Sequence, residues 1–238
     1  MDGKCCTNPI IRGTCYTSGM CSSFSQTGSI RILEEITRQT GLQVLDQSAA
    51  GVPEQGERTQ RPYNEVLVIF AGKDGQLKLA PMYWQLIHYW EKEFKSKYSC
   101  FNVRAESLGK PHNEALLMRR RCVFPVAGFF ESRKMNGRPV KPRQVFEFSL
   151  PGRNLMSLGG IYFAWRNPND DTDRRLSCGI ITVEPNETVA EVHNRMPLMI
   201  AVKDVGRWLD PGFQELSRLK GMIKPFGGEL NSRLISHA

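Results

Sequence analysis

The sequence predicts an α+β fold in a single domain, built mainly from antiparallel strands that form a curled or barrel-like sheet with a few peripheral helices. Most apolar runs are short and rich in β-branched residues, and brief turns join them with few helical patterns between. A doubly wound parallel sheet would need a helix between consecutive strands. With 238 residues, of which 40% are hydrophobic, the chain is long enough for one large core.

The first half of the chain contains one helix and one clear hairpin. A helical spacing of apolar residues that ends at Gly41 predicts an amphipathic helix over residues 29–40. Residues 48–61 are polar and broken by glycine and proline, as in a surface loop. Two apolar runs, 66–70 and 77–79, flank a Lys-Asp-Gly turn and predict a hairpin.

The second half continues the pattern of short strands, and no internal repeat interrupts it. We expect strands at residues 122–126, 144–150, 155–164 and 176–183, with a hairpin around Asn136-Gly137. Helices or helical turns are expected at residues 113–120, 188–192, 202–209 and 213–220.

Composition narrows the class of protein. No run of about 18 apolar residues is present, and the N-terminus lacks the apolar segment of a secretory signal, so we expect a cytoplasmic protein with no membrane partner. Residues 1–20 lack periodicity and are expected to be a flexible leader or the result of a misassigned start. The seven cysteines are scattered without a C-x-x-C pair, which argues against a disulfide framework or a zinc site, and no cofactor is expected.

The charge is unevenly distributed. The chain carries a net charge of +8, and residues 119–143 hold eight basic side chains against the single acid Glu131. A basic surface attracts polyanions and supplies phosphate contacts that do not depend on base sequence. Nucleic acid is therefore a candidate partner, although a solvated basic hairpin would carry the same charge.

Three short motifs place a polar side chain beside apolar residues. Asn102 lies within residues 101–106, Glu131 follows two phenylalanines, and His193 lies within residues 192–197. An apolar setting raises the pKa of a carboxyl, and histidine titrates near neutrality, so both side chains suit proton transfer. A structural ion pair for Glu131 and a hydrogen-bonded core role for His193 stay open, but three such motifs together favour a site.

These motifs belong to a longer series that resembles the SRAP family, the SOS response-associated peptidase-like, abasic-site processing proteins. The resemblance runs from about Cys21 to the C-terminus, so we expect a family-like domain over residues 21–238. The motifs are Met20-Cys21-Ser22-Ser23-Phe24, Trp84-Gln85-Leu86-Ile87, Phe101-Asn102-Val103-Arg104-Ala105-Glu106, Arg121-Cys122-Val123-Phe124-Pro125, Gly128-Phe129-Phe130-Glu131 and Val192-His193-Asn194-Arg195-Met196-Pro197.

The resemblance implies an activity and a set of roles. Family members trap abasic sites in single-stranded DNA as a thiazolidine, through a cysteine that follows the initiator methionine. A self-processing peptidase activity is also ascribed to the family. Here the resemblance assigns crosslinking to Cys21, polar support to Asn102 and Glu131, and acid/base work to His193. The implied DNA contacts are Arg104 and Thr182, with a phosphate-binding fork from Arg195 and base stacking from Trp84.

The chemistry explains why a terminal cysteine suits the task. An α-amine has a pKa of about 7.7 to 8.0, so part of it is free base at neutral pH, whereas the lysine amine titrates near ~10.4. After the amine condenses with the aldehyde of an opened abasic sugar, the thiol of the same residue can close a five-membered ring. Trp84 and Trp90 together would form a stacking platform, although core packing is the ordinary role for one of them.

The chain also departs from the family pattern. Cys21 follows twenty other residues, so its α-amine is free only if translation starts at Met20 or if the leader is removed. Ser22 and Ser23 replace a glycine and an arginine, and Gln85 replaces a glycine. Two other functions therefore stay open: a catalytically degenerate protein that only binds single-stranded DNA, and an autocatalytic cysteine peptidase or lyase that uses Cys21 with His193. A monomer is expected in each case.

Overall fold

The structure is a computed structural model, and it describes residues 23–47, 57–135, 138–153 and 155–237. The expected leader, residue Cys21 and the tip of the hairpin at 136–137 lie outside this part of the chain. The strands are β1 Ser23–Gln26, β2 Leu45–Asp46, β3 Arg58–Gln60, β4 Glu65–Ala71, β5 Leu77–Trp84, β6 Asn102–Arg104, β7 Arg121–Val126, β8 Gly128–Ser132, β9 Lys134–Met135, β10 Arg138–Pro139, β11 Gln144–Ser149, β12 Met156–Asn167, β13 Asp170–Val183, β14 Met196–Pro197, β15 Met199–Ile200 and β16 Asn231–His237.

The helices are few and short. The longest is α1, which runs over the predicted residues and ends at Gly41, where a φ of 70° lets the glycine N–H cap the carbonyl of Thr37. The helices are α1 Ser29–Thr40, α2 Pro111–Arg119, α3 Glu187–Ala190, α4 Val205–Leu209 and α5 Leu216–Met222, with 3-10 turns η3 Ala105–Gly109, η4 Pro151–Arg153 and η5 Val202–Asp204.

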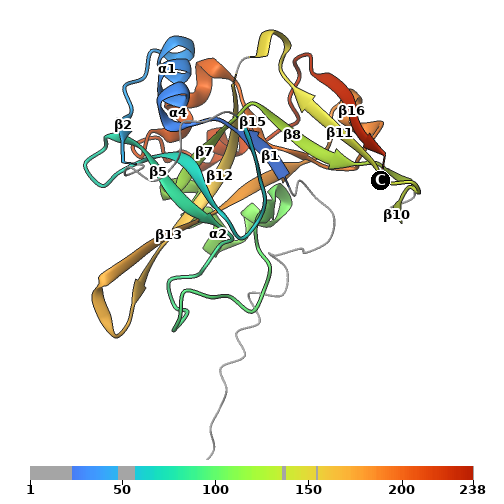
Figure 1. The fold of residues 1–238 in the computed structure, drawn as a ribbon. Coiled ribbons are helices and arrows are strands. Elements are labelled where there is room, and N and C mark those ends of the chain that lie inside the picture. Colours follow the sequence, from blue (N-terminus) through green and yellow to red (C-terminus); the bar gives the residue numbers. More distant parts are fainter. Residues whose placement is uncertain (1–22, 48–56, 136–137, 154, 238) are drawn as a thin grey trace, which may run out of the picture.

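Five strands close into a barrel, which confirms the predicted α+β, barrel-like architecture. The pairing runs from β7 through β12, β13, β5 and β4 and back to β7. Every step is antiparallel except β13 with β5, which pair in parallel and complete the circuit. In Figure 1 the hairpin of β12 and β13 extends well beyond the barrel, and α1 and α4 lie toward the opposite end.

A second sheet, in the order β16-β11-β8-β1-β3, packs beside the barrel. Gln26 of β1 joins the two: its side-chain amide donates to the carbonyls of Leu67 and Pro125 at 2.8 and 3.1 Å, and its oxygen accepts from the N–H of Leu67 at 2.9 Å. Because Gln26 is buried, these bonds satisfy all of the polar groups that it brings into the interior.

Most predicted elements are present, and the differences have physical reasons. The helix expected at 213–220 begins later, at Leu216, because residues 210–213 form a turn with bonds from Gly212 and Phe213 back to Asp210. The sequence indicated neither β1 nor β16: β1 has four residues, and β16 is mostly exposed, so neither shows a clear apolar alternation.

The described cysteines include both free thiols and a disulfide-bonded residue. Cys122 and Cys178 are free thiols, and burial raises the pKa of both, so they stay protonated. Cys100 is disulfide-bonded, a pairing that the scattered cysteines of the sequence did not indicate. Among the residues that the structure describes, no helix is long and apolar enough to cross a membrane.

Candidate functional site

Glu131 is held inside the second sheet by the strand that carries it. Along β8 it points to the same side as Phe129, and across the sheet it pairs with Phe146 of β11. The ring of Phe129 stacks on Phe148 with centroids 5.0 Å apart, so the carboxyl lies beside an aromatic layer. Only 4% of Glu131 is exposed. A carboxyl in this setting requires polar partners or a chemical use.

The first described residue lies next to this carboxyl in the sheet. Ser23 at the start of β1 pairs with Phe130, which directly precedes Glu131. Cys21, the residue to which the resemblance assigns the crosslink, comes two residues before Ser23 and lies outside the described part of the chain. The strand register therefore places the N-terminal end of the described chain beside the strand that carries Glu131.

Asn102 is positioned by a short strand that borders the barrel. In β6 it pairs in parallel with Ile180 of β13, and only 1% of it is exposed. The preceding residue, Phe101, accepts bonds at its carbonyl from the indole of Trp84 at 2.9 Å and from the N–H of Ile180 at 3.0 Å. These two bonds fix the backbone beside Asn102.

His193 lies in a tight turn after α3. Its N–H donates to the carbonyl of Val189 at 2.8 Å, and Asn186 caps the start of α3. Nδ1 of His193 lies 3.1 Å from the backbone nitrogen of Arg195 and 3.2 Å from the carbonyl oxygen of the same residue. The ring accepts from this N–H in one tautomer and donates to this carbonyl in the other, so in both cases the backbone of Arg195 holds Nδ1.

Arg195 is buried and occupied by acidic partners rather than open to DNA. Its guanidinium forms two bonds to Glu106, at 2.6 and 3.0 Å, one to Glu184 at 2.7 Å, and one to the carbonyl of Thr182 at 2.6 Å. The bonds from Arg195 lower the pKa of Glu106. Thr182 has no exposed surface, and the fork of Arg195 is occupied by these acceptors instead of a phosphate.

The fold brings the three motifs toward one another through β13 and one further bond. Thr182 of β13 pairs with Arg104 of β6 and with Pro197 of β14, so the Asn102 and His193 motifs lie on the two sides of one strand. The N–H of Lys134, just after β8, donates to the carbonyl of Val192 at 2.9 Å. This bond ties the chain that follows Glu131 to the residue that precedes His193.

The position of Trp84 contradicts the expectation that this residue stacks on a base. Its ring is wholly buried against Phe24, at 4.7 Å between centroids, and against Phe101 and Phe124. Trp90 lies on the surface instead, 40% exposed and stacked on His88 at 4.2 Å. The two tryptophans thus divide into one core residue and one surface residue.

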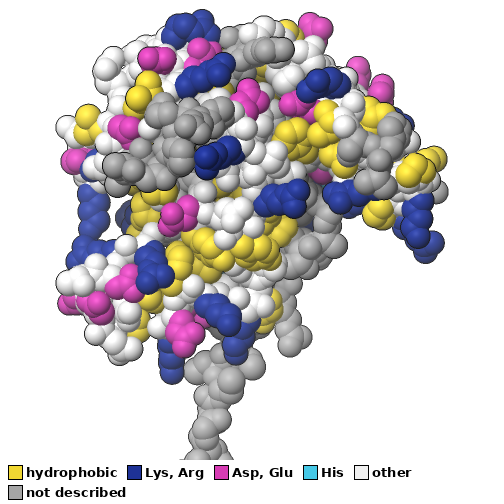
Figure 2. All heavy atoms as spheres, viewed as in Figure 1, with side chains coloured by type: hydrophobic (Ala, Val, Ile, Leu, Met, Phe, Trp, Pro, Cys, Tyr) yellow, Lys and Arg dark blue, Asp and Glu magenta, His cyan; other side chains and the backbone are white. Residues whose placement is uncertain are grey.

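The basic segment 119–143 also divides into buried and exposed parts. Arg121 is buried and donates to the carbonyls of five residues, and burial lowers its pKa to about 10. Arg133 packs over the ring of Phe146, and Arg143 donates to Ser132 at 3.0 Å. Figure 2 shows Lys and Arg side chains spread around an apolar band and mixed with acidic ones. Within the described residues, no cluster of three or more His, Cys, Asp and Glu side chains is placed to hold a metal ion.

Sequence reasoning missed several residues that build this site. Glu106 stands inside a motif that was recognised, but only the structure shows that it binds Arg195, and Glu184 and Gln26 gave no signal at all. The signal that could have revealed this contact is the presence of one acid, at the end of the 101–106 motif, and one arginine, in the 192–197 motif, which could form an ion pair.

A closed five-stranded barrel with an adjoining sheet, and with buried amide, carboxyl and imidazole side chains in segments that the fold joins, defines a distinct class of single-domain α+β protein. The sequence profile of the SOS response associated peptidase (SRAP) family matches residues 20–238. The chain therefore belongs to the SRAP family.

Named relatives and solved structures agree with this assignment. Abasic site processing protein YoqW of Bacillus subtilis (strain 168) is 29% identical over 153 residues, which is 64% of this chain and 66% of that protein. Abasic site processing protein HMCES of Xenopus tropicalis is 27% identical over 157 residues, which is 56% of this chain and 45% of that protein. The chain thus spans about two thirds or less of the length of these relatives.

Two crystal structures share the fold. A protein from Bacteroides thetaiotaomicron superposes with a TM-score of 0.69 at 19% identity, covering 91% of this chain and 92% of the other. A protein from Bordetella bronchiseptica superposes with a TM-score of 0.70 at 15% identity, covering 91% of this chain and all of the other.

Proposed function

We propose that this protein processes abasic sites in single-stranded DNA, and that it does so by forming a thiazolidine crosslink through Cys21 as its N-terminal residue. The observation that carries the proposal is the burial of Asn102, Glu131 and His193 in segments that the fold joins, with Ser23 paired to Phe130, the residue before Glu131. The names of the relatives, which are abasic site processing proteins, support the substrate class.

The reaction joins one cysteine to one aldehyde with loss of one water. The free α-amine attacks C1′ of the ring-opened sugar, forming a C–N bond, and the resulting carbinolamine loses its hydroxyl as water to give an imine. The thiol then adds to the imine carbon, forming a C–S bond, and its proton passes to the nitrogen. No oxidant or reductant is required, because the carbon stays at the aldehyde oxidation level.

The buried polar side chains fit the proton transfers in this sequence. Glu131 is suited to give a proton to the departing hydroxyl and to take one from the thiol. The imidazole of His193 titrates near neutrality and is held at Nδ1 by the backbone of Arg195, which leaves Nε2 as the ring nitrogen suited to exchange a proton. Asn102 can both donate and accept, which suits it to hold the amine or amide of the cysteine.

An exposed loop next to this site has the composition of a single-strand interface. Residues 87–99 leave the barrel after Trp84 and return at Phe101, and the N–H of Leu86 closes the loop on the carbonyl of Cys100 at 2.8 Å. The loop holds three lysines against two glutamates, together with the exposed rings of Tyr89, Trp90 and Tyr98. Aromatic rings that stack on bases, with cations that contact phosphates, bind single strands with little dependence on sequence.

The mechanism requires a chain that begins at Cys21. The family profile begins its match at Met20, the residue directly before it. Removal of that methionine, or cleavage of the peptide bond between Met20 and Cys21, would expose the α-amine. We therefore treat residues 21–238 as the active form in the test that follows.

The test compares two forms of the protein, one beginning at Met1 and one beginning at Cys21, after incubation with a single-stranded oligonucleotide that carries one abasic site. Intact mass under denaturing conditions should rise only for the form that begins at Cys21, by the mass of the oligonucleotide less one water. Cys21→Ala in the same form should lose the stable adduct and keep salt-sensitive DNA binding. If Cys21→Ala still forms the adduct, the proposed mechanism is wrong. If no form gains mass but DNA binding persists, the protein is a binding homologue only.

A further inference from the structure

A pocket that shares no lining residue with the candidate site lies in the C-terminal part of the chain. It has a volume of about 570 Å³ and is lined by residues from β15, η5, α4 and α5 and from the turn at 224–228. None of Asn102, Glu131 and His193 lines it. Its size falls within the range of pockets that hold small organic ligands.

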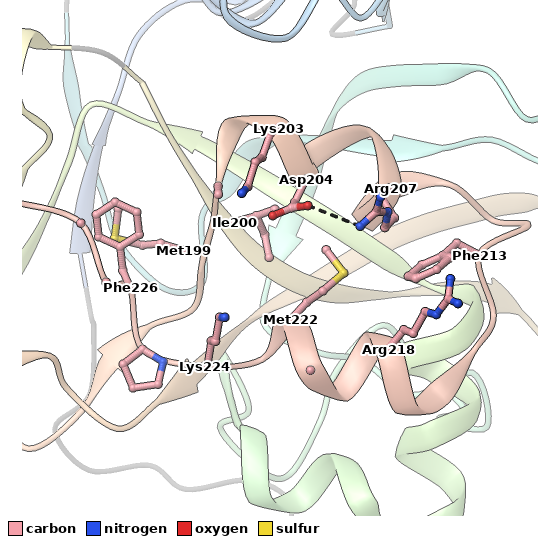
Figure 3. A pocket seen from close by; sticks show the side chains of 15 residues that line it. Met199, Ile200, Lys203, Asp204, Arg207, Phe213, Arg218, Met222, Lys224 and Phe226 are labelled. Carbon is pink, nitrogen blue, oxygen red and sulfur yellow. Dashed lines mark ion pairs between the residues drawn. The ribbon is translucent and has the colours of Figure 1, made fainter.

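The lining of this pocket is basic. It contains Lys203, Arg207, Arg218 and Lys224 against the single acid Asp204. Asp204 pairs with Arg207 at 3.7 Å, and Glu215, just outside, pairs with Arg218 at 3.0 Å. The two lysines form no ion pair within the described residues. In Figure 3 their amines approach the cavity from opposite sides.

The rest of the lining is apolar and includes flat and adaptable side chains. Met222 lies near the centre of the view in Figure 3, and Met199 and Phe226 lie together at one end. Phe213 lies at the other end, with the guanidinium of Arg207 5.9 Å from its ring centroid. Methionines adapt to irregular ligand shapes, and aromatic and guanidinium planes stack on flat rings.

From this arrangement we infer that the pocket binds a nucleotide, with its phosphate between Lys203 and Lys224 and its base against the apolar lining. A phosphate monoester carries a charge of about −1.5 to −2 at neutral pH, which matches two lysines that form no ion pair with any described residue. A purely apolar ligand would leave the lysines unused, and inorganic phosphate alone would leave the apolar lining in water. The phosphate belongs either to a free nucleotide or to the 5′ end of a DNA strand, and both present the same chemistry.

The test measures binding by titration calorimetry on the whole protein with four probes: dAMP, deoxyadenosine, inorganic phosphate, and an undamaged oligonucleotide with or without a 5′ phosphate. We expect dAMP to bind at least about tenfold more tightly than either deoxyadenosine or phosphate, a difference of about 1.4 kcal/mol. The double variant Lys203→Gln/Lys224→Gln should weaken dAMP binding by about tenfold or more, since it removes both charged contacts. Both lysines are exposed, so the fold should tolerate the change.

A matched control removes the same charge elsewhere. Lys73→Gln/Lys110→Gln leaves the pocket intact and should keep dAMP affinity within about twofold, because distant surface charges are largely screened. Trp90→Ala should have equally little effect on dAMP, which separates this pocket from the proposed DNA loop.

These outcomes test the nucleotide pocket whether or not the protein forms the proposed DNA crosslink. Binding of the 5′-phosphorylated strand but not of dAMP, with loss in the pocket variant, would identify a strand end as the source of the phosphate and still support the site. The inference is overturned if no nucleotide probe binds, if the pocket variant binds dAMP as well as the unchanged protein does, or if inorganic phosphate binds as tightly as dAMP.

Discussion

Arg195 and Glu106 are joined by two hydrogen bonds, at 2.6 and 3.0 Å, across 89 residues of sequence. Arg195 belongs to the segment that carries His193, and Glu106 follows the strand that carries Asn102. Since the backbone of Arg195 also holds Nδ1 of His193, the ion pair anchors the segment that sets the orientation of the imidazole. The pair therefore connects two of the three motifs physically.

Arg195→Lys should lower stability by about 1–2 kcal/mol, because the ammonium cannot reproduce the fork that reaches Glu106, Glu184 and the carbonyl of Thr182 together. Chemical denaturation measures the change. Arg175→Lys serves as the control, since Arg175 pairs with Asp173 on an exposed hairpin and its loss should cost less than about 1 kcal/mol. Equal losses of stability in the two variants would mean that the buried network contributes no more to stability than an exposed ion pair.

The Glu106 carboxyl should make the protein less stable as the pH falls into the acid range. Its pKa is lowered from 4.5, chiefly by the hydrogen bonds from Arg195. A depressed pKa in the folded state adds stability that is fully present above the ordinary value and is lost as pH falls through the folded value. The stability advantage of the unchanged protein over Glu106→Gln should therefore be constant above 4.5 and shrink in stronger acid. Denaturation at a series of pH values tests this, and an advantage that grows in acid would contradict it.

Gly160 in β12 should tolerate no side chain. A Cβ there would lie 2.5 Å from Phe124 Cε2 and 2.6 Å from the carbonyl oxygen of Gly179, inside the barrel. Gly160→Ala should destabilise the protein by about 1–3 kcal/mol, as overpacking does. Gly109→Ala is the control, because no atom lies within 4 Å of its Cβ position. Thermal unfolding of both variants gives the comparison, and equal midpoints would refute this account of the barrel packing.

The barrel could be predicted from sequence more readily than the site. The strands β4, β7, β12 and β13 are long enough to show apolar, β-branched runs. In contrast, β6 has three residues and forms only because β13, far along the chain, offers it a parallel edge. The approach of the Asn102 and His193 motifs depends on that pairing, which local sequence does not encode.

Burial of a particular side chain was equally hard to predict. Trp84 and Trp90 stand six residues apart in the same aromatic run, and nothing local distinguishes them. The difference arises because Phe24, from β1, packs on Trp84 at 4.7 Å between centroids. Arg195 is a similar case, since its fork suits a phosphate as well as it suits Glu106.

The two tryptophans should respond oppositely to substitution. Trp84→Ala should cost about 3–5 kcal/mol of stability, because it empties a wholly buried site. Trp90→Ala should change stability by less than about 1 kcal/mol and weaken single-stranded DNA binding by about 1–3 kcal/mol, the usual effect of losing one stacked base. Denaturation and fluorescence anisotropy separate the two effects. Unchanged DNA affinity in Trp90→Ala would remove the loop from the proposed interface.

Glu131→Gln should slow adduct formation while leaving DNA binding unchanged. The amide keeps the shape of the carboxyl among the aromatic rings but cannot exchange the protons that imine formation and ring closure require, so the rate should fall by about 100-fold or more. Glu147→Gln is the matched control: Glu147 lies on the adjacent strand β11, pairs with Phe130, and is bound to Arg233 at the surface. Quenched time courses by intact mass, with the form that begins at Cys21, give both rates. If Glu131→Gln reacts as fast as Glu147→Gln, the buried carboxyl serves the fold and not the chemistry.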